Sequence, residues 1–162
     1  RQIDIPIKFY ITGEALPQQK EILDVICEYH LENRIVFLGK LTNKEVWPYW
    51  KGASLAILNK NDNVQNRNGF STKLGEILLS ETAVITTTVG EANHYLKDGE
   101  SAYIVEPHQP KLIAEKIIQA INNPEERGRI AKKGKEIAEK EFDCIYQGNR
   151  LIYFFSSIVE MQ

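Results

Sequence analysis

The sequence is poor in cysteine, and its apolar residues form no long run. The only two cysteines, Cys27 and Cys144, lack the spacing of a CxxC zinc or redox site. We expect both to be core thiols in a reducing compartment. No apolar segment approaches the ~20 residues that cross a bilayer, and the first residues lack the charge pattern and cleavage site of a signal peptide. These absences predict a cytoplasmic chain.

The sequence also lacks a strong excess of either charge. Its 20 Lys and Arg residues face 22 Asp and Glu residues, and the basic residues between 126 and 140 alternate with glutamates. A surface that attracts nucleic acid is therefore not expected. A chain of 162 residues that is 43% hydrophobic can bury one sizeable core. We predict a single domain over residues 1–162, as a fragment of a longer chain, because the first residue is not Met and a strand begins almost at once.

Apolar segments alternate with segments of helical periodicity. We predict strands at 7–12, 34–39, 54–59, 83–87 and 102–105, and a polar loop at 60–69. Helices are predicted at 17–31, after a capping box at Thr42 and Glu45, from Ser71, around 91–96, and at 110–121, 125–142 and 146–161. Continuously apolar strands between helices indicate an α/β fold, a Rossmann-like doubly wound parallel sheet with helices on both faces.

Ligands of such folds bind at the carboxyl ends of the strands, so the loops after Thr12, Leu38, Asn59 and Thr87 are the places to search. These loops carry Gly13, Gly39, Gly69 and Gly90, which leave room for a ligand to approach the backbone. The segment from Asn66 to Thr87 is the strongest candidate. Gly69 allows a tight turn and Ser71 can cap the next helix, whose N-terminus suits a phosphate oxygen.

Lys73 and Glu76 are three residues apart and share a helical face, opposite the apolar Leu74, Ile77 and Leu78. A carboxylate so placed can accept two hydrogen bonds from a ribose diol, and the lysine can add charge beside a diphosphate. Spacing alone favours an ordinary exposed Lys–Glu pair, because such pairs are common. His30 and the tryptophans Trp47 and Trp50 are expected to be structural, His30 at a helix end and the tryptophans in the core.

From Ile7 to Phe142 the chain resembles the C-terminal nucleotide-binding half of GT-B glycosyltransferases of family 4, also called glycosyl transferase group 1. The pieces that carry the resemblance are "IKFYITG", "RIVFLGKLTNKEVWPYWKGASLAIL", "NGFSTKLGEILLSETAVITTTVGEANHYLKDGESAYIV" and "PKLIAEKIIQAINNPEERGRIAKKGKEIAEKEF". The third piece is the most specific, because it contains the family's turn, helix, apolar strand, Gly-Glu turn and "DG" in order.

The resemblance implies a donor site for a nucleoside diphosphate sugar. Glu76 falls on the glutamate that binds the ribose, and Lys73 is expected at the diphosphate. The resemblance implies that the turn near the sugar and diphosphate consists of Gly69, Phe70, Ser71 and Thr72. It implies that the loop beside the base consists of Gly39, Lys40 and Leu41, and that Gly13 and Gly90 also line the cleft.

The resemblance has departures too. Asn68 occupies the position of the family's first glutamate, near the transferred sugar, and Ser80, Glu81 and Thr82 replace a small-Gly-polar run. The Arg and Lys that neutralise the leaving diphosphate in the family would lie upstream of Arg1. We therefore identify no certain catalytic residue here and expect the fragment alone to be inactive.

For the whole protein, the resemblance implies sugar transfer with retention at the anomeric carbon, without a metal or other cofactor, in the synthesis of cell-surface polysaccharide or glycolipid. The implied partner is an absent N-terminal acceptor-binding domain of the same chain, which would also decide any contact with the inner face of the membrane. Two alternatives stay open: a non-catalytic nucleotide-sugar binding module and a GT-B sugar-nucleotide epimerase.

Overall fold

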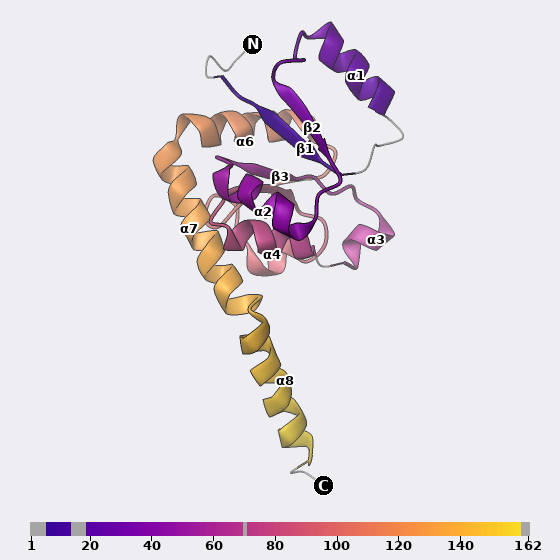
Figure 1. Cartoon of the computed structure of the whole chain (residues 1–162). Helices are drawn as coiled ribbons and strands as arrows, with labels where there is room; N and C mark the ends of the chain where they lie inside the picture. The colour runs from indigo at the N-terminus through magenta and orange to yellow at the C-terminus, as the bar shows by residue number, and fades with distance from the viewer. Residues whose placement is uncertain (1–5, 14–18, 70, 160–162) are drawn as a thin grey trace. The chain divides into compact units, whose positions relative to one another are not determined.

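The computed structural model describes residues 6–13, 19–69 and 71–159 (Figure 1). The chain forms two compact units, Arg1–Tyr49 and Trp50–Gln162. Strands β1 and β2 pair in the first unit, and β3, β4 and β5 pair in that order in the second. Every one of these pairs is parallel. The predicted α/β class with parallel strands is confirmed, whereas the single domain stays a prediction.

The first unit contains β1 (Phe9–Thr12), α1 (Gln19–Glu28) and β2 (Ile35–Gly39). Helix α1 ends as predicted near His30, which adopts a left-handed φ of 54°. The backbone N–H of His30 donates to Cys27 O and that of Leu31 to Ile26 O, the two bonds of a Schellman motif. The histidine therefore ends the helix through its backbone conformation.

The strands of the first unit are less covered than their apolar sequences predict. Phe9, Tyr10 and Phe37 remain exposed, and on α1 only Ile26 is buried among the described residues. A two-stranded sheet with one helix offers few partners for both of its faces. Strand β2 is therefore only partly buried in this structure.

Helix α2 (Asn43–Gly52) begins with the predicted capping box. Thr42 N donates to Glu45 Oε2 at 2.8 Å, and Glu45 N donates to Thr42 Oγ1 at 3.4 Å. The bonds from Thr42 lower the pKa of the Glu45 carboxyl. Trp50 packs against a core cluster as expected, but Trp47 is 38% exposed, so its assignment to the core is wrong.

The second unit is a three-stranded sheet with a core on each face. Leu74, Leu78 and Val84 belong to one cluster, whereas Ile85 and Ile130 belong to the other. Successive strand residues point to opposite faces, which explains why Val84 and Ile85 separate. The elements are β3 (Ala56–Leu58), α3 (Val64–Arg67), α4 (Thr72–Leu79), β4 (Val84–Thr87), α5 (Ala92–Tyr95), β5 (Tyr103–Val105), α6 (Pro110–Asn122), α7 (Pro124–Glu141) and α8 (Cys144–Val159).

Helix α4 ends in a left-handed residue, Glu81, with φ of 60°. The Glu81 carboxylate pairs with Lys135 Nζ at 2.8 Å, and the hydrogen bond from Lys135 lowers the pKa of the Glu81 carboxyl. Beside it, the buried Ser80 hydroxyl donates to Ile77 O at 2.6 Å and the Thr82 hydroxyl donates to Trp50 O at 2.6 Å. The Ser80–Thr82 departure noted in the sequence is thus a hydrogen-bonded helix end.

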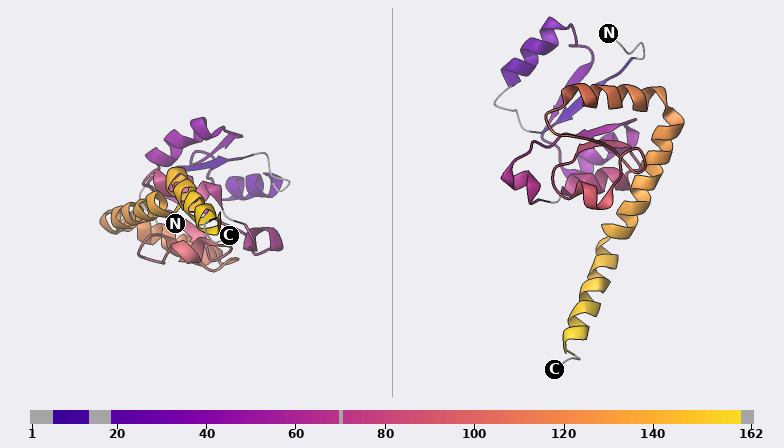
Figure 2. Two further views of the ribbon diagram at one scale, coloured as in Figure 1. Left: turned by 90° about the horizontal axis from the view of Figure 1, so that it is seen from below. Right: turned by 180° about the vertical axis from the view of Figure 1, so that it is seen from behind.

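Two further expectations fail. Residues 60–69 are not only a polar loop, because α3 lies within them, started by the Asn63 side chain accepting from Asn66 N at 2.8 Å. Cys27 and Cys144 are both exposed, so the prediction of core thiols is wrong. Helix α8 extends beyond the end of α7 (Figure 2), and Tyr153 on it is exposed. Among the described helices, none combines the length and apolarity needed to cross a membrane.

At Gly134, helix α7 packs closely against Leu78 and the backbone of Ser101. A Cβ at this position would lie 2.7 Å from Leu78 Cδ2 and 2.8 Å from Ser101 O, whereas a Cβ at Gly128 on the same helix would meet nothing within 4 Å. We predict that Gly134→Ala lowers the free energy of unfolding by about 1–2 kcal/mol, because overpacking outweighs the gain in helix propensity. The matched change Gly128→Ala should raise it by about 0.5–1 kcal/mol. Chemical denaturation measures both; stabilisation by Gly134→Ala would contradict the tight contact.

Candidate functional site

The carboxyl ends of β3 and β4 are joined through one threonine. Lys60 N donates to Thr87 Oγ1 at 3.3 Å, and the Thr87 hydroxyl donates to Lys60 O at 3.1 Å. Next to it, the Thr86 hydroxyl donates to Leu58 O at 3.4 Å. Both threonines are buried, so these bonds satisfy polar groups that have left water. They also fix where the loop after β3 begins.

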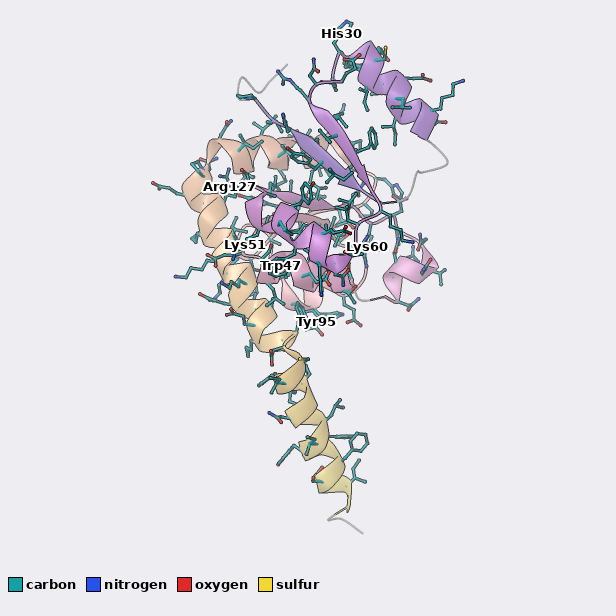
Figure 3. All side chains as sticks on the ribbon, viewed as in Figure 1. His30, Trp47, Lys51, Lys60, Tyr95 and Arg127 are labelled. Atoms are coloured by element: carbon teal, nitrogen blue, oxygen red, sulfur yellow. The ribbon has the colours of Figure 1, made fainter. Side chains whose placement is uncertain are left out.

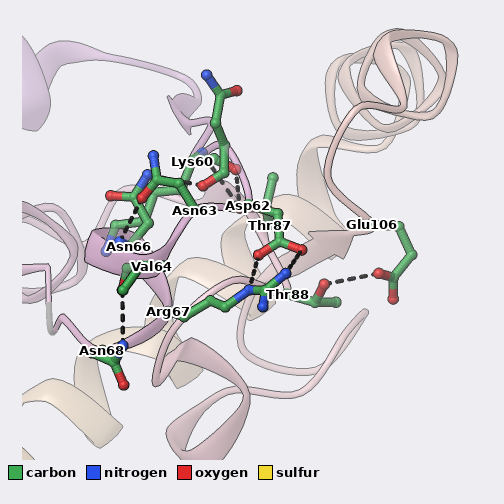
Figure 4. Close-up of polar contacts among 11 residues, drawn as sticks. Lys60, Asp62, Asn63, Val64, Asn66, Arg67, Asn68, Thr87, Thr88 and Glu106 are labelled. Carbon is green, nitrogen blue, oxygen red and sulfur yellow. Dashed lines mark hydrogen bonds and ion pairs between the residues drawn. The ribbon is translucent and has the colours of Figure 1, made fainter.

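The loop after β3 is ordered by its own polar side chains (Figure 4). Asn66 Nδ2 donates to Asn61 O at 2.8 Å, and Arg67 Nη2 donates to Asp62 Oδ2 at 2.8 Å. The hydrogen bond from Arg67 lowers the pKa of the Asp62 carboxyl. Together with α3, these contacts hold the segment that leads into Gly69 in a defined shape.

Gly90 follows β4 and lies against this segment. Its φ is 81°, and a Cβ there would come within 2.7 Å of Asn66 O, 3.0 Å of Gly69 O and 3.8 Å of Lys60 Nζ. Glycine is therefore required at position 90 both for its left-handed backbone and for space. Gly69 does not adopt a left-handed φ, but a Cβ there would lie 3.0 Å from Gln65 O. Its role in the turn is close packing.

Helix α4 starts directly after this turn. Ser71 is the N-cap residue with extended backbone, but its side chain makes no capping hydrogen bond, so the predicted side-chain cap is wrong. The first N–H groups of the helix are therefore not taken up by that hydroxyl. Thr72 and Lys73 are exposed and Glu76 is half-buried, whereas Leu74, Ile77 and Leu78 are buried as predicted. Phe70 lies outside the described residues.

Asn68 has a structural role that the sequence did not reveal. It is the C-cap of α3, and its Nδ2 donates to Val64 O at 2.8 Å. A glutamate at this position has no donor for that bond, and its charge would face the negative end of the helix. The Asn68 side chain is exposed, and its Oδ1 is a hydrogen-bond acceptor.

The first unit holds the remaining site residues that the sequence predicts. Gly13 N donates to Gly39 O at 2.9 Å, so the carboxyl ends of β1 and β2 are bonded to each other. Both glycines have positive φ, and a Cβ at either would meet nothing within 4 Å. Lys40 follows as an exposed residue and Leu41 as a half-buried one. The predicted open backbone at these strand ends is present.

Within the second unit, the structure brings Gly69, Ser71 and Glu91 to one small recess, together with Lys60. The recess is too small to enclose a nucleotide, so a ligand would lie across the strand ends. Lys60 was not predicted as a site residue. The available signal was its place directly after β3, where a strand of a parallel sheet presents its carboxyl end. His94 on α5 is exposed.

Comparisons with known proteins agree with this architecture. Residues 1–137 match the family described as Glycosyl transferases group 1. An uncharacterized glycosyltransferase of Methanocaldococcus jannaschii is 26% identical over 151 residues, which cover 93% of this chain and 41% of that protein. The N-acetyl-alpha-D-glucosaminyl L-malate synthase of Bacillus anthracis is 23% identical over 139 residues, covering 86% of this chain and 34% of the synthase.

Solved structures show the same fold. HepE of Anabaena in complex with UDP has a TM-score of 0.82 at 22% identity, with 93% of this chain and 41% of HepE covered. HepE has also been solved with UDP-glucose, at a TM-score of 0.78 and 21% identity. The sucrose-phosphate synthase of Thermosynechococcus elongatus has a TM-score of 0.78 at 18% identity and covers 94% of this chain and 39% of the synthase.

The chain thus spans 34% to 41% of the length of these relatives and structures. The family match includes the strand ends, the turn at Gly69 and helix α4. The chain belongs to the glycosyl transferases group 1 family, and its fold is that of a GT-B glycosyltransferase domain.

Proposed function

We propose that this chain is the donor-binding, C-terminal domain of a retaining glycosyltransferase of family 4. It binds a nucleoside diphosphate sugar, and the whole protein transfers the sugar to an acceptor. The observation that carries the proposal is Glu76, half-buried on α4 behind the turn at Gly69, inside the segment that matches the family. The binding of UDP and UDP-glucose by HepE, which shares the fold, supports a nucleotide donor.

The described residues suggest how a donor is held. The Glu76 carboxylate accepts two hydrogen bonds from the ribose diol, and the exposed Lys73 lies on the side of the diphosphate. The N–H groups at the start of α4 face the diphosphate, where negative charge grows as the sugar departs. Hydrogen-bond donors aimed at that growing charge stabilise the transition state more than they stabilise the bound sugar nucleotide. This difference in stabilisation makes the transfer faster.

The rest of the proposal concerns the whole protein. An N-terminal acceptor-binding domain completes the active site and supplies further cations for the leaving diphosphate. The donor-binding domain alone is therefore catalytically inactive. Gly39, Lys40 and Leu41 lie beside the base, and Gly13 forms the floor of the cleft. The reaction requires no metal or other cofactor, and the product enters cell-surface polysaccharide or glycolipid on the cytoplasmic side of the membrane.

A second function is favoured by one observation. The Asn68 amide is used to cap α3, and no carboxylate stands at the position where the family has one near the transferred sugar. This arrangement suits a binding module that holds nucleotide sugars without transferring them. Incubation of the intact protein with radiolabelled UDP-, GDP- and ADP-sugars and a lipid extract as a source of acceptors separates the two functions: transfer of the labelled sugar with release of the nucleoside diphosphate supports the transferase, and binding without transfer supports the module.

The ribose assignment is tested by Glu76→Ala in the intact protein. Hydrogen bonds to a charged carboxylate contribute about 1.5–3 kcal/mol each, so we predict that the loss of two lowers the affinity for UDP about 100-fold or more. Isothermal titration calorimetry measures the change, after a screen of UDP, GDP and ADP by thermal stabilisation identifies the preferred base.

The matched control for Glu76→Ala is Glu139→Ala, which removes an exposed carboxylate from α7 in the same unit. It should leave the affinity unchanged. Equal affinities for wild type and Glu76→Ala would contradict the ribose contact.

The turn at Gly69 is tested by Gly90→Ala. The added Cβ would strike Asn66 O, and we predict at least a tenfold loss of UDP affinity because the turn is displaced from the helix start. Gly99→Ala is the control: Gly99 has a φ of 70° but nothing within 4 Å of a Cβ, so it introduces the same strain without the collision. Its cost should be about 1 kcal/mol of unfolding free energy, with UDP affinity intact. Comparable affinities for the two variants would show that the collision has no effect on binding.

A further inference from the structure

Lys60 is a lysine at the proposed donor site whose side chain has no assigned role. It follows β3 directly, at the carboxyl end of the sheet, and it is labelled in Figure 3. We propose that Lys60 binds the diphosphate of the donor and moves there from a resting contact with the turn at Gly69. The inference rests on the donor-binding function proposed above and adds a residue to it.

The backbone of Lys60 is fixed. Its N–H and its C=O both bond to the Thr87 hydroxyl, at 3.3 Å and 3.1 Å, and Thr87 is buried in β4. The side chain therefore always starts from the same point at the strand ends. A lysine fixed in this way loses less conformational freedom on binding than one on a loose loop.

The side chain, by contrast, is held weakly. Lys60 Nζ donates to Gly69 O at 3.5 Å, which is long for a hydrogen bond, and this acceptor is neutral. Glu91 lines the same recess, but in the part of the chain that the structure describes no carboxylate forms an ion pair with Lys60. A half-buried ammonium with one long bond to a carbonyl gains more from a phosphate oxygen than it loses by leaving Gly69.

The position of the ammonium matches that of the expected anion. Gly69 lies two residues before Ser71, the N-cap of α4, so Lys60 Nζ rests at the turn that leads into the helix N-terminus. A Cβ at Gly90 would lie 3.8 Å from Lys60 Nζ, an ordinary contact distance, so the ammonium lies beside the backbone of Gly90. Lysine has a flexible stem and three donors, so a short movement is enough to exchange the carbonyl for a diphosphate oxygen.

One other role for Lys60 is compatible with the same geometry. Its bond to Gly69 O could serve only to hold the turn in place, without any contact to the ligand. The two roles differ in which part of the ligand they affect. Loss of a phosphate contact weakens the binding of UDP and spares uridine, whereas a displaced turn weakens the binding of both through the ribose.

The test compares Lys60→Met and Lys60→Arg in the intact protein. Lys111→Met is the control, because Lys111 is an exposed lysine on α6. Affinities for UDP and for uridine are measured by calorimetry and by NMR titration. We expect Lys60→Met to weaken UDP binding at least tenfold and to leave uridine binding within twofold of wild type. Lys60→Arg keeps the charge and should stay within about threefold for UDP, and Lys111→Met should match wild type.

Several results would overturn the inference. Wild-type affinity of Lys60→Met for UDP shows that the lysine does not touch the diphosphate, and an equal loss for UDP and uridine assigns it to the turn. If Lys60→Arg loses as much affinity for UDP as Lys60→Met, the positive charge of the lysine is not what binds UDP. If wild type binds none of UDP, GDP and ADP, the donor-binding function itself fails, and this inference fails with it. Melting temperatures of the three variants show whether each is folded.

Discussion

The hydrogen bonds between the Thr87 hydroxyl and the Lys60 backbone are the constraint on which the candidate site depends. Two adjacent parallel strands end at this point, and one side chain satisfies both backbone groups of the residue that leaves the sheet. From there the loop runs through α3 to Gly69. The carbonyl oxygens of Asn66 and Gly69 can lie this close to Gly90 because Gly90 has no Cβ. Substituting Thr87 would leave buried polar groups without partners at the base of the site.

The fold class could be predicted from the sequence because local patterns in both units agree with the structure. Val84 and Ile85 alternate between two covered faces, and the capping box at Thr42 and Glu45 forms as its spacing predicts. The prediction fails where burial depends on elements beyond the local segment. The apolar β1 and β2 stay largely exposed, and so does Tyr153 on α8, because apolar periodicity says that a face is suited to burial and not what covers it.

Part of the candidate site could also be predicted. Glycines at strand ends and a Lys–Glu face on α4 are visible in the sequence, and the structure places Gly69, Gly90 and α4 around one turn. For Lys60 the sequence offers only its place directly after a strand, because a lysine in a polar loop has no distinctive spacing. Its place becomes informative only through a long-range contact, from Nζ to a turn that follows nine residues later.

Asn68 shows how a departure from a family pattern can have a local cause. Its side-chain amide donates to Val64 O at 2.8 Å, in addition to the Asn68 backbone N–H at 3.3 Å, and a carboxylate has no N–H for this second bond. A carboxylate there would lose the bond and meet the carbonyl end of α3, so the presence of α3 and the presence of a glutamate oppose each other. The amide at position 68 thus has a structural role in ending α3.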